Sequence, residues 1–279
     1  MAATFNSFVT ETNSNVRILY YEADRTDIEV LNVGNNTAST WASNGEYGVN
    51  GTFFSNSNFM MGFAINDGAH VFSSTLNCDG TDWINFFRPF SCAVCFDNIL
   101  PNTRKILDFG VCKRSIPYSI EEDTVELSNI TWGIGGINLY IGDNTITSET
   151  SLISRIKADV DAVTDAAYRV ANGYVVDMTS KLARTAIGYK APGKVVLAAF
   201  VKNSDYTSRT GAADIFDVRQ IMKNELNCTF GLLLDGGSST QISYKKDNAN
   251  SSIVVSGACY CRVGLESSTS IKWNWGATS

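Results

Sequence analysis

One stretch decides the fold of this chain: Phe230-Gly-Leu-Leu-Leu-Asp-Gly-Gly-Ser-Ser-Thr-Gln241. Its start belongs to the apolar run Thr229–Leu234, which is typical of a strand buried on both faces. The strand ends at Asp235, so we expect this carboxylate at the edge of a sheet. Gly236 and Gly237 can then point successive N–H groups at one spot, beside the hydroxyl groups that follow. The stretch predicts a phosphate site next to an acid; an ordinary hairpin with a Gly-Gly turn is the alternative.

This stretch is also the last part of a strand, helix, strand unit. Lys194–Val201 is a second continuous apolar run, and the segment Asp214–Leu226 between the two runs has helical periodicity. We expect Asp214 to cap this helix, because its side-chain oxygen can accept from a free N–H of the first turn. The unit predicts a local parallel crossover inside an otherwise antiparallel arrangement.

Short β-type runs dominate the first half of the chain, where clusters of Asn, Gly and Asp separate them. We expect strands at Val16–Tyr21, Ile28–Val33, Tyr47–Phe54, Phe59–Ile65, Trp83–Phe87, Ala93–Phe96 and Lys105–Phe109. A second helical pattern covers Ser148–Ala171, with Ser148 as its cap and Gly173 beyond its end. The fold class predicted is α+β, with a mixed β-sheet core and a few flanking helices.

The composition narrows the classes of function. The 279 residues are 44% hydrophobic and 18% charged, which excludes wholesale disorder, collagen and coiled coil. The net charge of −6 argues against nucleic acid or an acidic membrane surface as a partner, because both attract basic faces. Residues 1–12 have neither a basic start nor an apolar stretch, so we expect a cytoplasmic protein of microbial or phage origin.

Seven cysteines are an odd number in a chain too long to need a disulfide scaffold. We interpret them mostly as buried free thiols. Cys92-Ala-Val-Cys95 and Cys259-Tyr-Cys261 could form halves of a zinc site, but both lie in strand-like sequence and no histidine follows them.

Two further motifs carry polar side chains that suit a sugar phosphate. Asn50 and Gly51 follow a predicted strand, where an exposed side-chain amide can both donate to and accept from a sugar hydroxyl. Arg184 precedes an apolar strand and has a planar fork that fits a phosphodiester. The alternative for the first motif is a turn, and for the second a solvated surface arginine.

Taken together and in order, four segments resemble the phosphodiester glycosidase family. They are Asn50-Gly-Thr-Phe-Phe54, Gly133-Ile-Gly-Gly-Ile-Asn-Leu-Tyr-Ile-Gly-Asp143, Arg184-Thr-Ala-Ile-Gly188 and Leu234-Asp-Gly-Gly-Ser-Ser-Thr240. The resemblance spans about residues 45–265 and implies a single domain of this family over 1–279. The helical segment 148–171 looks like an insertion near the site, where it could reshape or cover the pocket.

The chain departs from the family pattern at three places. Thr52 replaces the second Gly of Asn-Gly-Gly-Phe-Phe, Leu182-Ala183 replaces the His-Pro before the arginine, and Asp-Gly-Gly-Gly-Ser-Ser-Thr is one Gly shorter. The residues that the resemblance assigns to the site remain in place. The departures bear on the substrate more than on the type of reaction.

The resemblance implies hydrolysis of a glycosidic bond to a phosphate in a sugar-phosphodiester. The implied catalytic residues are Asp235, Arg184 and Asn50, and the implied substrate-binding residues are Gly51, Thr185, Gly236, Gly237, Ser238 and Ser239. Asp235 could be a general base, a nucleophile or a metal ligand, so a divalent metal ion stays open as a cofactor. Glu46 and Asp177 are candidates for a partner carboxylate.

Two other functions remain open at this point. An enzyme of the same fold could degrade a nucleotide-derived or cyclic phosphodiester, and a non-catalytic carbohydrate-binding or virion-associated protein belongs to a different class altogether. If the protein is an enzyme, we expect its partner to be a small molecule, either a sugar-phosphodiester or a nucleotide-derived ligand.

Overall fold

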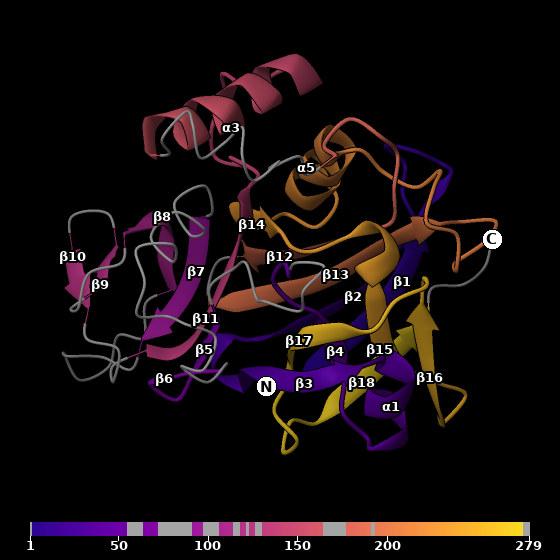
Figure 1. Cartoon of the computed structure of the whole chain (residues 1–279). Coiled ribbons are helices and arrows are strands. Elements are labelled where there is room, and N and C mark those ends of the chain that lie inside the picture. The colour runs from indigo at the N-terminus through magenta and orange to yellow at the C-terminus, as the bar shows by residue number, and fades with distance from the viewer. Residues whose placement is uncertain are drawn as a thin grey trace.

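The computed structural model describes residues 2–54, 64–71, 91–96, 106–113, 118–120, 123–125, 130–163, 177–190 and 193–275. Within these residues the chain forms two β-sheets and three α-helices (Figure 1). The predicted fold class, a mixed β core with a few flanking helices, is confirmed.

The larger sheet runs through the middle of the molecule. Its strand order is β10-β9-β8-β7-β11-β14-β12-β13-β2-β1-β18, with β5 and β6 joined to β11 at the side. In chain order the strands are β1 (Ala3–Val9), β2 (Val16–Asp24), β5 (Ala64–Asn66), β6 (Ala69–His70), β7 (Ser91–Phe96), β8 (Ile106–Lys113), β9 (Tyr118–Ile120), β10 (Asp123–Val125), β11 (Ile130–Asn138), β12 (Arg184–Lys190), β13 (Lys194–Lys202), β14 (Phe230–Leu233) and β18 (Ile271–Trp275). Neighbouring strands are antiparallel except β1 and β18, which pair in parallel.

The smaller sheet has the order β16-β15-β4-β17-β3. Its strands are β3 (Ile28–Asn36), β4 (Gly48–Asn50), β15 (Gln241–Lys246), β16 (Ala249–Val254) and β17 (Cys259–Leu265). The central strand β4 is only three residues long, whereas the sequence predicted a strand over Tyr47–Phe54. The chain leaves the sheet after Asn50, at the point where the candidate site begins.

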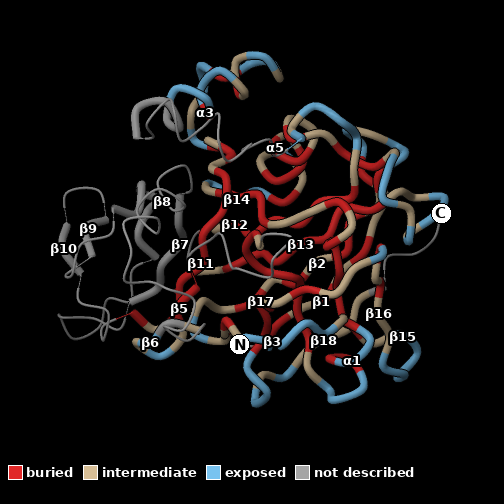
Figure 2. The backbone as a smooth tube through the Cα atoms, viewed as in Figure 1, coloured by how far each residue is buried: buried red, intermediate tan, exposed pale blue. Residues whose placement is uncertain are grey.

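Strand β13 shows why the larger sheet lies between two cores. Leu197, Ala199 and Val201 face the smaller sheet, whereas Val196 and Ala198 face the helices, because successive side chains of a strand point to opposite faces. All five are fully buried, as Figure 2 shows for this part of the sheet. The continuous apolar run in the sequence is therefore a strand covered on both faces.

The helices cover the outer faces of the sheets. Helix α3 (Glu149–Val163) and helix α5 (Ile215–Asn224) supply apolar side chains to the core on one face of the larger sheet. Helix α1 (Ala38–Ser43) packs with residues of β3, β16 and β17 on the smaller sheet. No helix within the described part of the chain is long and apolar enough to cross a membrane.

Both expected helix caps are present. The Asp214 side chain accepts from the N–H of Asp217, at 2.8 Å, and the helix that it caps ends within two residues of the predicted end. The Ser148 hydroxyl accepts from the N–H of Ser151, at 3.2 Å. Helix α3 is described up to Val163, and the rest of the predicted segment 148–171 lies outside the described residues.

The strand, helix, strand unit forms the predicted crossover. Strands β13 and β14 run in the same direction, since both pair antiparallel with β12, which lies between them. Helix α5 connects them and packs against the same face. The crossover carries the chain over one strand of the sheet and delivers the end of β14 to the junction between the two sheets.

Some expectations lie beyond what the structure describes. Of the strand predicted at Phe59–Ile65, only the end is described, as part of β5, and Trp83–Phe87 lies outside the described residues. Strands at Ala93–Phe96 and Lys105–Phe109 are confirmed by β7 and β8.

Candidate functional site

The candidate site forms where three strand ends meet between the two sheets. These are the end of β4 with Asn50, the start of β12 with Arg184 and Thr185, and the end of β14 with Asp235. The Asn50 side chain donates from Nδ2 to the main-chain oxygen of Asp235, at 2.8 Å. Two motifs that are 185 residues apart in the sequence are thus joined by one hydrogen bond.

The Asn50 side chain makes hydrogen bonds to several strands of this junction. Its Oδ1 accepts from the Thr185 hydroxyl, at 2.7 Å, and from the N–H of Gln241, at 3.0 Å. The side chain is fully buried, so the exposure that the sequence analysis expected of this amide is wrong. The amide hydrogen-bonds the protein rather than lying open to solvent because strands from both sheets converge on it.

Main-chain hydrogen bonds fix the same junction. The N–H of Leu234 donates to the Thr185 oxygen, at 2.8 Å, and the N–H of Asp235 donates to the Gly51 oxygen, at 3.2 Å. The N–H of Gly51 in turn donates to the Cys261 oxygen, at 2.7 Å. Asp235 is therefore held from both sheets, and its main chain has little freedom to move.

The Gly-Gly turn is not a hairpin. Strand β14 belongs to the larger sheet and β15 to the smaller one, so the loop between them crosses from one sheet to the other. A 3₁₀ turn over Gly237–Ser239 makes this crossing, and Gly237 has a φ of 62°, in the left-handed region that favours glycine. The hairpin alternative is thereby excluded, and Ser238 and Ser239 lie beside Asp235 in a compact loop.

The Asp235 carboxyl has a pKa far above the usual value for an aspartate. Burial raises its pKa from 3.8 to about 7, against the lowering effect of hydrogen bonds from Ser239 and from the N–H of Gly236. The latter N–H lies 2.9 Å from Oδ1. A carboxyl with a pKa near 7 can gain or lose a proton at neutral pH, which general acid or base catalysis requires.

Arg184 also lies at the junction, but its guanidinium donates to main-chain oxygens. Nε donates to Ala213 at 3.2 Å, and Nη2 donates to Asp177 at 2.5 Å and to Ser180 at 2.8 Å. The side chain is 2% exposed. Burial lowers the pKa of this guanidinium, while the carboxylates of Asp177 and Asp214 raise it. Contact of Arg184 with a phosphate stays a prediction.

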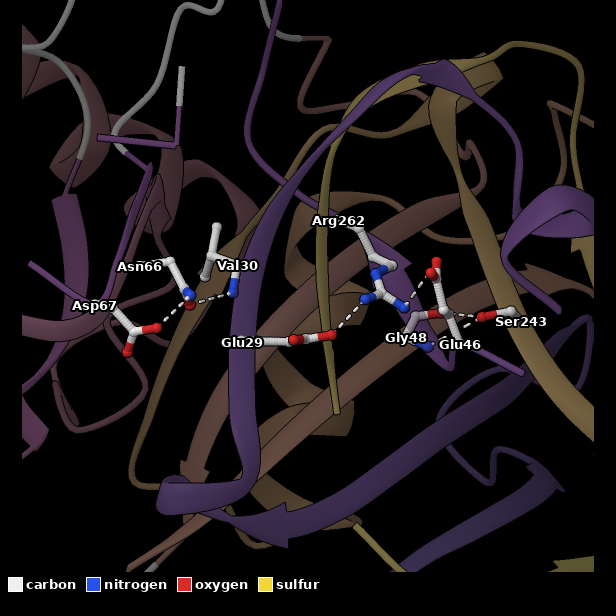
Figure 3. A network of polar contacts seen from close by, with 8 residues as sticks. All are labelled: Glu29, Val30, Glu46, Gly48, Asn66, Asp67, Ser243 and Arg262. Atoms are coloured by element: carbon white, nitrogen blue, oxygen red, sulfur yellow. Dashed lines mark hydrogen bonds and ion pairs between the residues drawn. The ribbon is translucent and has the colours of Figure 1, made fainter. Parts of the chain in front are cut away.

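The two candidate partner carboxylates are engaged elsewhere. The exposed Asp177 carboxylate accepts from the side chain of Ser180 and from its N–H, the latter at 2.9 Å, and these hydrogen bonds lower the pKa of Asp177. Glu46 precedes β4 and so lies at the opposite end of this strand from Asn50, where its carboxylate is 3.6 Å from Nη1 of Arg262 (Figure 3). The structure brings neither carboxylate against Asp235 through a hydrogen bond.

Two residues of the junction were not predicted from the sequence. Gln241 is fully buried, and its side chain accepts from the N–H of Ala38 and donates to the Gly257 oxygen, each at 2.7 Å. Arg209 lies in the loop before α5, with its side chain against Gly237. Neither has a local sequence signal, because each reaches the site through the tertiary fold.

Metal-binding side chains and thiols were the other candidates for chemistry at this junction. Across the described ranges, no group of three or more His, Cys, Asp and Glu side chains is placed to hold a metal ion. Cys259 and Cys261 are buried free thiols on β17. Burial raises the pKa of Cys261 to about 12 and that of Cys259 well above its usual value, so both stay protonated at neutral pH.

Comparison with known proteins identifies the family of the chain. A family model described as phosphodiester glycosidase matches residues 101–258, more than half of the chain. This segment contains the Arg184 and Asp235 motifs. No curated protein matches the sequence.

Two solved structures share the fold. The zebrafish N-acetylglucosamine-1-phosphodiester alpha-N-acetylglucosaminidase catalytic domain, auto-inhibited by its pro-peptide, is 15% identical, with a TM-score of 0.57 over 95% of this chain and 82% of that chain. A candidate exported protein from Burkholderia pseudomallei is 14% identical, with a TM-score of 0.52 over 90% of this chain and 74% of that chain. At such identities the likeness establishes the fold alone.

Proposed function

The chain belongs to the phosphodiester glycosidase family, and from this premise we propose that it hydrolyses the glycosidic bond between a sugar and the phosphate of a sugar-phosphodiester. The observation that carries the proposal is the Asp235 carboxyl, with a pKa raised to about 7 at the junction of the family's motifs. The zebrafish structure of the same fold adds support, since its name specifies a phosphodiester of N-acetylglucosamine.

The leaving group decides what the site has to supply. A phosphate monoester has a second pKa of about 6, so it leaves as an anion and needs little help from a proton donor. The attacking water, in contrast, must lose a proton as it bonds to the sugar carbon. We therefore assign Asp235 the role of general base, and the charge that develops on the phosphate must be stabilised by hydrogen-bond donors and cations.

Two properties of Asp235 suit this role. Its pKa is close to neutral pH, where a base has both enough ionised form and enough proton affinity to be effective. Its main chain is fixed by Asn50 and by the Gly51 oxygen, so the carboxyl is held in one place before the substrate arrives.

Hydrolysis in ¹⁸O-labelled water tests the reaction. The substrates are the methyl phosphodiester of α-N-acetylglucosamine 1-phosphate, the matching glucose compound, a cyclic dinucleotide and a 3′,5′-cyclic mononucleotide. We expect turnover of a sugar diester with ¹⁸O in the sugar, because the bond between carbon and oxygen breaks. Label in the phosphate would identify a phosphodiesterase, and turnover of the nucleotides alone would favour the alternative substrate class.

The pH profile of the active substrate tests the role of Asp235. A general base works when ionised, so turnover should rise through about pH 7 to a plateau and be about a hundredfold lower at pH 5. Turnover that falls over this range would instead assign the carboxyl to proton donation.

A further inference from the structure

The phosphate of the proposed substrate needs a cation, and the arginine that the sequence selects already has protein partners. Three hydrogen bonds tie Nε and Nη2 of Arg184 to the oxygens of Ala213, Asp177 and Ser180. These bonds hold the segment that leads into β12 against the loop before α5. These bonds engage Nε and Nη2 of a guanidinium whose residue is 2% exposed, so Arg184 contributes to holding the fold at this point.

A second arginine, Arg209, lies in the same loop before α5. The side chain of Arg209 is exposed, and among the described residues no hydrogen bond or ion pair engages it. Its main chain is nevertheless fixed, because its oxygen accepts from the N–H of Ala183, at 2.9 Å, and the N–H of Gly211 donates to the Lys181 oxygen, at 2.6 Å. Arg209 is thus held directly beside the start of β12.

The Arg209 side chain lies against the glycine turn of the site. A Cβ built on Gly237 would be 3.4 Å from Nε and 4.0 Å from Cγ of Arg209. Gly237 follows Asp235 by two residues, so their Cα atoms are at most about 7 Å apart. The absence of a side chain at Gly237 leaves room for the Arg209 side chain against the turn that Gly237 forms with Ser238 and Ser239.

We propose that Arg209 is the residue that binds the phosphate group of the substrate, an inference that rests on the proposed function and assigns a part of its site. A guanidinium can donate two parallel hydrogen bonds to a phosphate, and its charge is always present. From its place against the glycine turn that follows Asp235, it stabilises the negative charge that moves onto the phosphate when the glycosidic bond breaks. Arg184 then shapes the loop that presents Arg209.

Binding of inorganic phosphate, followed by isothermal titration calorimetry, tests this assignment without any turnover. Arg209→Gln should weaken phosphate binding at least about tenfold, and Arg209→Lys should weaken it less, because the charge remains while the fork is lost. Lys272→Gln is the matched control: it removes one charge from an exposed residue of the edge strand β18 and should leave affinity unchanged. Arg184→Lys tests the rival assignment, in which the guanidinium that the family motif supplies binds the phosphate.

Three results would overturn the assignment: wild-type affinity in Arg209→Gln, a loss of affinity confined to Arg184→Lys, or no measurable phosphate binding by the wild type. Failure of the proposed function has a different signature. In that case phosphate binding still depends on Arg209, while none of the sugar diesters is hydrolysed.

Discussion

Two polar clusters adjoin the small strand β4, one at each end, and their carboxyl groups have different partners. At the end with Asn50, the Asp235 carboxyl accepts hydrogen bonds from an N–H and a hydroxyl, and within the described part of the chain no ion pair engages it. At the end with Glu46, the Glu29 and Glu46 carboxylates share the guanidinium of Arg262, which is 1% exposed (Figure 3).

Under the proposed function, this difference separates a carboxyl group that takes part in the reaction from a carboxyl group that stabilises the fold. Burial raises the pKa of both Asp235 and Glu29, but the charge of Arg262 opposes the rise at Glu29. An ion pair favours the charged form and fixes it, whereas a carboxyl held by neutral donors can change its charge near pH 7. The comparison predicts that one cluster can lose its charge without harm to the fold and that the other cannot.

The largest effect is expected at Asp235. Asp235→Asn keeps the shape and can still accept from the N–H of Gly236, but it removes the base, so turnover should fall by about 10²- to 10⁴-fold. The fold should stay intact, since the main-chain contacts with Asn50 and Gly51 are unchanged. Steady-state kinetics and a thermal melt on the same preparation measure both quantities.

The opposite pattern would refute the role of Asp235. If the variant melts much earlier and retains its specific activity while folded, the carboxyl only satisfies the donors of its own turn. The two clusters would then both be structural.

The next effect in size is expected at Arg262, in the other cluster. Arg262→Met keeps a long side chain but leaves Glu29 partly buried without its cation, which should lower the free energy of unfolding by about 2–3 kcal/mol. This corresponds to a fall in Tm of about 4–12 °C for a chain of this size. Turnover per folded molecule should stay at the wild-type value at 20 °C.

A double variant checks the cause of that fall. Arg262→Met combined with Glu29→Gln removes the uncompensated charge, so it should recover at least half of the lost stability. If the double variant is no more stable than the single one, the loss arises from packing around the Met side chain instead of from the charge.

The same comparison explains what the sequence could and could not predict. The crossover unit and both helix caps follow from local pattern, because apolar periodicity and a side-chain oxygen before the first turn act within a few residues of each other. The Asp235 loop was predicted from an apolar run that is followed by an aspartate, two glycines and hydroxyl residues. The burial of Asn50 and the contacts of Gln241 and Arg209 were not predictable, since each depends on which strands of two different sheets meet.

The contacts of two arginines were also beyond the sequence. Arg184 stands in the motif, and its contact with a phosphate stays a prediction, but its hydrogen bonds to main-chain oxygens depend on the path of the segment before it. Arg262 had no motif at all, and its partner Glu29 lies 233 residues away. Burial of charged side chains is a property of the assembled sheets.

The smallest expected effect is the part of the pH dependence of stability that comes from the Asp235 carboxyl. Its pKa rises from 3.8 to about 7 on folding, so the folded protein binds the extra proton between these values. The stabilisation by this proton is complete below about pH 4 and is lost as the pH rises through 7. Asn cannot ionise, so the Tm of Asp235→Asn relative to the wild type should increase from pH 5 to pH 8. For this half-buried group we expect the difference in the free energy of unfolding to change by about 1–2 kcal/mol, which corresponds to about 2–8 °C in Tm.

Asp247→Asn is the matched control, because Asp247 lies at an exposed turn position with a φ of 51° that Asn also tolerates. Its difference in Tm from the wild type should stay constant over this pH range. A constant difference for Asp235→Asn as well would mean that the carboxyl is ionised throughout, and the contrast between the two clusters would disappear.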